Sequence, residues 1–145
     1  MIYIGIDPGA HGGIAIVEED DVRVMPFSKE ALLDLRAYRN LAYTVMCCLE
    51  KVGPMPKQGV VSMFNFGMNY GYIKGVLEAY NIPYQEIPPK RWKKEFGLDG
   101  AKAKSIEVCQ KLCPEASLLA TERSRVPHDG MAEALLMAIY ARRKL

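Results

Sequence analysis

The sequence has few of the features that mark zinc-binding, disulfide-bonded or membrane-spanning chains. It contains four cysteines, and none forms a CxxC pair, because Cys47 and Cys48 are adjacent and Cys109 and Cys113 are four residues apart. We therefore expect reduced cysteines packed as small hydrophobic side chains, not a zinc site. No apolar run approaches the roughly 18 residues that cross a bilayer. The first residues lack a basic segment and a cleavage motif, so we expect no signal peptide and a cytoplasmic protein.

The chain also has almost no net charge. The chain has 19 Lys and Arg residues against 17 Asp and Glu residues, a formal net charge of +2. As a sum, this value argues against a nucleic-acid-binding protein. The distribution argues for one, because the segment from Lys90 to Lys104 contains six basic and two acidic residues.

Composition and hydrophobic periodicity predict one α/β domain over residues 1–145. Hydrophobic residues make up 50% of the chain and charged residues 25%, which is typical of a globular protein. Three β-rich runs separated by turn residues, at 2–7, 13–17 and 22–26, predict an antiparallel meander. Further strands are expected at 44–52 and 84–87, and helices after Ser28 and at 63–80, 101–113 and 129–143, with 90–104 partly helical. This order predicts a mixed sheet.

Four carboxylates occur on elements that otherwise have a buried pattern. Asp7 ends the first strand, Glu50 lies in the apolar fourth strand, and Asp129 and Glu133 begin the apolar last helix. A buried carboxylate needs a cation, a hydrogen-bond donor or a proton. Asp129 and Glu133, at i and i+4, share a helical face, where a divalent cation would relieve their repulsion. Oxygen ligands favour Mg²⁺ or Mn²⁺.

Each acid also has a purely structural interpretation. Asp7 could form the turn before Pro8, Glu50 could pair with Lys51 or a neighbouring Arg, and Asp129 could cap the last helix. The presence of all four acids on three apolar elements favours a metal site.

The basic residues predict a nucleic-acid interface, with a merely solvated surface as the alternative. Trp92 and Phe96 interleave with the cations, which suits either base stacking or anchoring of the segment to the core. We expect contacts with nucleic acid from Lys57, Lys90, Arg91, Lys93, Lys94, Lys102, Lys104, Arg123 and Arg125.

Three motifs resemble the RuvC-like Holliday junction resolvases of the ribonuclease H-like superfamily, especially the compact type carried by phages and prophages. The motifs are IGIDPGAHGGIAI, CLEKVGPMPKQGVVSMFNFG and HDGMAEALLMA. The resemblance implies an α/β, ribonuclease H-like fold with a five-stranded mixed sheet, its first three strands antiparallel, flanked by helices. It also implies that Asp7, Glu50, Asp129 and Glu133 hold two Mg²⁺ ions per active site, with Mn²⁺ as a substitute.

The activity implied is hydrolysis of phosphodiester bonds in four-way (Holliday) and other branched DNA junctions, leaving 5′-phosphate ends. In that mechanism the two ions activate a water and hold the leaving oxygen, and we expect Asp7 to bridge them. The resemblance further implies a homodimer through the helix at 63–80 and, for a phage-encoded protein, the cytoplasm of a bacterial host. Many family members carry Asp as the last ligand, three residues after its partner. Because Glu133 follows Asp129 by four, which of the two binds metal directly stays open.

Other functions fit parts of the pattern. A related nuclease acting on flaps, forks or RNA–DNA hybrids would have the same metal site, so only substrate profiling separates it. A non-catalytic branched-DNA-binding module is disfavoured by the four intact acids. The IDPG turn also occurs in actin-like ATPases, but that fold needs far more than 145 residues.

Overall fold

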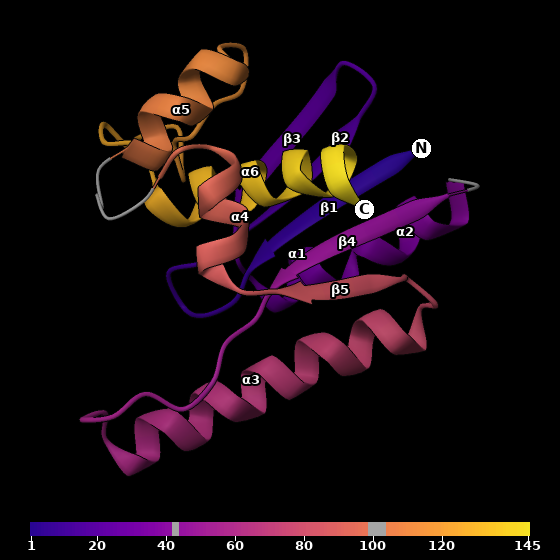
Figure 1. Ribbon diagram of the computed structural model, residues 1–145. Helices are drawn as coiled ribbons and strands as arrows, with labels where there is room; N and C mark the ends of the chain where they lie inside the picture. Colours follow the sequence, from indigo (N-terminus) through magenta and orange to yellow (C-terminus); the bar gives the residue numbers. More distant parts are fainter. Residues whose placement is uncertain (42–43, 99–103) are drawn as a thin grey trace.

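The computed structural model describes residues 1–41, 44–98 and 104–145 (Figure 1). Its strands are β1 (Ile2–Asp7), β2 (Gly13–Glu18), β3 (Asp21–Pro26), β4 (Val45–Glu50) and β5 (Tyr84–Ile87). Its helices are α1 (Lys29–Leu33), α2 (Leu35–Leu41), α3 (Val60–Ala79), α4 (Pro89–Glu95), α5 (Lys104–Leu112) and α6 (Asp129–Lys144). Within the described ranges, no helix combines the length and apolar character needed to cross a membrane.

The five strands form one mixed sheet in the order β3-β2-β1-β4-β5. The first three strands are antiparallel, whereas β1 pairs with β4 and β4 with β5 in parallel. This confirms the predicted fold class, including the antiparallel meander. The parallel pairing also brings the carboxyl ends of β1 and β4 to the same edge of the sheet.

Helices cover both faces of the sheet (Figure 1). One core cluster joins α6, α5 and α4 to one face, and a second joins α1, α2 and α3 to the other. In β1, Ile2, Ile4 and Ile6 are buried against the α3 side. Because successive side chains of a strand point to opposite faces, Gly5 and Asp7 face α6 instead.

The predicted helix after Ser28 is two helices in the structure. Ser28 caps α1 as expected, and its hydroxyl accepts a hydrogen bond from the Ala31 N–H at 3.0 Å. The chain then tightens at Asp34, whose carbonyl accepts from the N–H of Ala37, three residues on instead of four. Leu32 of α1 and Leu35 of α2 are both fully buried.

All four cysteines are free and buried, as the sequence indicated. Cys47 and Cys48 lie on opposite faces of β4, one in each core cluster. Cys109 packs between α5 and α6, where its thiol lies 3.7 Å from the carbonyl oxygen of Ala132. Burial raises the pKa of the Cys109 thiol to about 12, so it stays protonated and unreactive at neutral pH.

Candidate metal centre

Three of the four predicted acids come together at the carboxyl edge of the sheet. A carboxylate oxygen from each of Asp7, Glu50 and Glu133 lies within 4.8 Å of the others. Parallel pairing aligns Ile6 of β1 with Leu49 of β4, so Asp7 and Glu50 end the two strands side by side. Strand parity directs both side chains to the face that α6 covers. The cluster therefore follows from strand register and helix placement.

Close contact between α6 and the sheet brings Glu133 to this edge. A Cβ atom at Gly5 would clash with the carbonyl oxygen of Ala134, the residue after Glu133. A Cβ atom at Gly130 would clash with the carbonyl oxygen of His11, in the loop between β1 and β2. The missing side chains let the helix backbone lie directly on the strands, which places the first turns of α6 beside Asp7.

The electrostatics of the cluster fit a bound cation. Burial, followed by the charges of Glu50 and Glu133, raises the pKa of Asp7 to about 9. Burial also raises the pKa of Glu50, although a hydrogen bond from Trp92 opposes that rise. Without a metal ion, the site relieves its repulsion by holding a proton on Asp7. A set of crowded, half-buried carboxylate oxygens fits a hard divalent cation such as Mg²⁺ or Mn²⁺.

Helix α4 supplies two further contacts to the acids, from neighbouring residues. The indole Nε1–H of Trp92 donates to Glu50 Oε2 at 2.9 Å. The ammonium of Lys93 lies 3.7 Å from Glu133 Oε1. Its charge also opposes the rise in the pKa of Asp7. The sequence suggested Lys93 as part of a nucleic-acid interface and Trp92 as either a stacking or a core-anchoring residue. Their contacts with the acids were not foreseen, because nothing along the chain links α4 to β4 and α6.

The fourth predicted ligand, Asp129, lies outside the three-acid group. It is exposed at the first position of α6, whereas Glu133 is half-buried one turn later. The helix is capped by His128, whose Nδ1 accepts a hydrogen bond from the Met131 N–H at 3.1 Å, so Asp129 is not the capping residue. A direct ligand role is therefore better supported by position for Glu133 than for Asp129.

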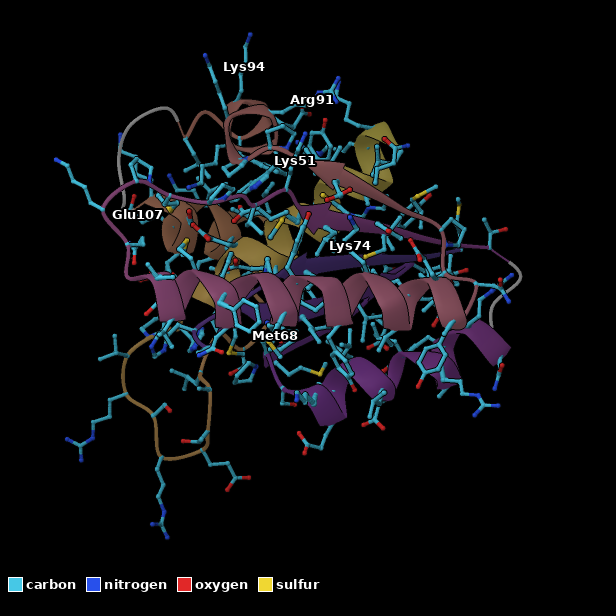
Figure 2. All side chains as sticks on the ribbon, turned by 90° about the horizontal axis from the view of Figure 1, so that it is seen from below. Lys51, Met68, Lys74, Arg91, Lys94 and Glu107 are labelled. Atoms are coloured by element: carbon cyan, nitrogen blue, oxygen red, sulfur yellow. The ribbon has the colours of Figure 1, made fainter. Side chains whose placement is uncertain are left out.

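The predicted nucleic-acid-binding residues divide by where they point. Lys93 turns toward the acids, whereas Arg91 and Lys94 extend outward from α4 (Figure 2). Arg91, Lys94 and Lys144 line a cavity of about 600 Å³ between α4 and the end of α6. Lys102 lies outside the described residues. The remaining predicted residues are exposed: Lys57, Lys90, Lys104, Arg123 and Arg125.

For Trp92, the sequence left two interpretations open, base stacking and anchoring of the segment to the core, and the structure selects between them. Its side chain is 0% exposed and lies in the core cluster of α6. It therefore anchors α4 to the core, and it is not available as a platform for base stacking. Phe96 is half-buried, packs against the same cluster and lies 5.2 Å from the Arg143 guanidinium, which is also an anchoring arrangement.

Comparisons with known proteins agree with this architecture. No protein-family model and no curated protein sequence matches the chain. Among solved structures, the chain is similar to Thermus thermophilus RuvC, with a TM-score of 0.60, 17% sequence identity, and coverage of 99% of this chain and 96% of that chain. It is similar also to T. thermophilus RuvC in complex with a Holliday junction substrate, with a TM-score of 0.62, 18% identity and the same coverage. The chain therefore has the RuvC-like, ribonuclease H-like fold over nearly its whole length.

Proposed function

We propose that this chain is a divalent-metal-dependent endonuclease that resolves four-way (Holliday) and other branched DNA junctions by phosphodiester hydrolysis, leaving 5′-phosphate ends. The observation that carries the proposal is the three-acid cluster on β1, β4 and α6 of a RuvC-like fold. The similar RuvC structure that holds a Holliday junction substrate supports the choice of DNA substrate.

The metal site proposed consists of Asp7, Glu50 and Glu133, with Asp129 as a peripheral fourth ligand. Bound Mg²⁺, two ions per site, supplies positive charge to the attacking water and to the leaving 3′ oxygen. Mn²⁺, with the same preference for oxygen ligands, is the expected substitute. Asp7 ends the central strand of the sheet, with an oxygen within 4.8 Å of Glu50 and of Glu133, and would be the ligand shared by the two ions. When metal binds, Asp7 gives up the proton that its raised pKa retains in the metal-free protein.

The DNA interface proposed is the basic surface around this site. Arg91 and Lys94 on the outer face of α4 contact backbone phosphates, and Lys57, Lys90 and Lys104, together with Arg123 and Arg125, extend the contact area. We propose the same contact for Lys93 and for Lys102, which lies outside the described residues. Phosphate contacts carry no sequence information by themselves, so we expect recognition mainly of the branched shape.

A homodimer is proposed through α3. Val60, Val61 and Phe64 in its first half are exposed, and Phe64, Met68 and Tyr72 follow one another at four-residue spacing along one side of the helix. The exposed fraction is 68% for Phe64 and 59% for Met68, and Figure 2 shows Met68 on the side of α3 turned away from the sheet. A four-way junction has two-fold symmetry, so a symmetric pair of sites matches it.

The test is cleavage of synthetic four-way, three-way, flap, fork, RNA–DNA hybrid and linear duplex substrates in Mg²⁺ and in Ca²⁺. We expect cutting of four-way junctions in Mg²⁺, binding without cutting in Ca²⁺, and no cutting by Asp7→Asn despite normal folding and junction binding. Equal cutting of linear duplex would contradict the proposal. Preference for flaps, forks or hybrids would assign a related nuclease, and binding without cutting in every metal would assign a binding module.

A further inference from the structure

Two neighbouring side chains of α4 each contact one of the three clustered acids. The two acids that they contact lie on different elements. Trp92 reaches Glu50 at the end of β4, and Lys93 reaches Glu133 on α6. The Lys93 ammonium also lies 5.4 Å from the centre of the Trp92 ring. Trp92 has no contact with solvent, so the indole cannot move without disturbing the core.

We propose that Trp92 is a positioning residue for the metal centre, which fixes the Glu50 carboxylate in the orientation that binds metal. This inference rests on the proposed metal site. The Trp92 N–H donates to Glu50 Oε2 at 2.9 Å, which restricts the last torsion of the glutamate side chain. Hydrogen bonds from outside the ligand set act in this way at protein metal sites, and their loss typically weakens metal affinity by about 10–100-fold.

Two features of the site support this role beyond core packing. The indole of Trp92 has one N–H donor, and this donor bonds to the Glu50 carboxylate although the rest of the side chain lies in an apolar cluster. Trp92 is also held rigidly, because α4 begins directly after β5, the strand that pairs with β4.

The first test uses Trp92 as its own reporter, since it is the single tryptophan of the chain. We expect Ca²⁺ or Mg²⁺ to change the tryptophan fluorescence of the wild-type protein saturably, and to shift its one indole N–H signal in a proton–nitrogen correlation spectrum. Glu50→Gln should abolish both responses. An indole signal that does not move while calorimetry detects Ca²⁺ binding to the same sample would overturn the inference.

The second test removes the donor and keeps the aromatic ring. Trp92→Phe should raise the calorimetric dissociation constant for Ca²⁺, and the Mg²⁺ concentration for half-maximal cleavage, by about 10–100-fold. Activity at saturating Mg²⁺ should largely return. The matched control is Phe96→Leu, which loses aromatic packing in the same core cluster but contacts none of the three acids. Equal Ca²⁺ affinity in the wild type, Trp92→Phe and Phe96→Leu would reduce Trp92 to a core residue.

These outcomes are separable from failure of the proposed function. Calorimetry and the indole signal measure metal binding without DNA, so they decide the role of Trp92 even if the chain cuts no branched substrate. If Trp92→Phe does not fold, the wild-type and Glu50→Gln indole signals still decide it. A chain that binds no divalent metal at all would contradict both proposals.

Discussion

Asp7 lies where three carboxylates meet, and its proton is the feature of the site most sensitive to pH. Its pKa is raised from 3.8 to about 9, first by burial and then by Glu50 and Glu133. Between these two values the folded protein retains a proton that the unfolded chain has lost. Stability of the metal-free protein therefore falls as the pH rises through this window, since the folded state binds more protons than the unfolded state.

This linkage predicts how melting temperature depends on pH and metal. The metal-free protein should melt at a lower temperature at pH 9 than at pH 6, and Asp7→Asn should flatten that dependence because it has no proton to lose. Ca²⁺ should raise the melting temperature more at pH 9 than at pH 6, because the proton on Asp7 competes with it less at the higher pH. Thermal melts with chelator or with Ca²⁺ at the two pH values provide the measurement. A metal-free protein that grows more stable over this range would contradict the raised pKa.

Glu133 and Asp129 should differ in importance although they are one helical turn apart. Glu133 belongs to the three-acid group, whereas Asp129 is exposed at the start of α6. We expect Glu133→Gln to lower cleavage by about 100-fold or more, because loss of outer partners alone costs about 10–100-fold. Asp129→Asn should lower it by less than about tenfold. Cleavage rates at several Mg²⁺ concentrations compare the two variants, and a larger loss from Asp129→Asn would reverse the assignment.

Some residues of the candidate site could be identified from the sequence, and others could not. Asp7, Glu50 and Glu133 were identifiable because each is an acid in an otherwise apolar run. Helical periodicity treats Asp129 and Glu133 as equivalent, yet His128 occupies the capping position and leaves Asp129 exposed. The bond between Trp92 and Glu50 joins residues 42 positions apart, and local pattern carries no information about that contact.

At the scale of elements, α4 has two faces with different roles. Trp92 and Lys93 turn toward the acids, whereas Arg91 and Lys94 turn outward and line the cavity with Lys144. The helix is short, and its attachment through a fully buried tryptophan fixes which cations reach solvent. The inner face contacts the clustered acids, and the outer face is the one that the proposed phosphate contacts require.

This division predicts separable effects on DNA and on metal. The double variant Arg91→Ala, Lys94→Ala should weaken junction binding and make the salt dependence of binding shallower by about 2 in the log–log slope. Calorimetric affinity for Ca²⁺ should stay unchanged, because neither residue contacts the acids. Lys74→Ala is the matched control: this half-buried lysine of α3 pairs with Glu86 at 3.4 Å. If Lys74→Ala weakened junction binding as much as the double variant does, a specific role of α4 in DNA binding would be contradicted.

At the scale of the whole molecule, the outer side of α3 exposes large apolar side chains, foremost Phe64 and Met68. Phe64 and Met68 lie opposite the buried side of the helix, which holds Ile73 and Leu77 against the sheet. Tyr72 is less exposed, and its ring centre lies 5.2 Å from the Lys29 ammonium of α1. A contiguous exposed apolar patch of this kind is typical of an interface. A two-fold contact would place each copy's patch against the same patch of its partner.

The prediction for assembly is that Met68→Glu converts a dimer into a monomer without unfolding it. The substituted carboxylates would be buried against each other at the two-fold contact, a costly arrangement. Light scattering or sedimentation measures the mass, and circular dichroism checks the fold. Met55→Glu changes an equally exposed methionine in the loop before α3 and should remain dimeric. A wild-type protein that is monomeric at micromolar concentration would contradict the proposed dimer.

The α/β class, the antiparallel meander, the apolar elements and a set of four candidate acids, of which three meet, can be read from the sequence alone. Those features are local: strand alternation, turn residues and the isolated acids at Asp7, Glu50 and Glu133 are all visible within a few neighbours. The tertiary structure decided what depends on contacts between distant segments. Parallel pairing of β1 with β4, the close approach of α6 at Gly5, and the anchoring of α4 by Trp92 select which acids meet and which cations face outward.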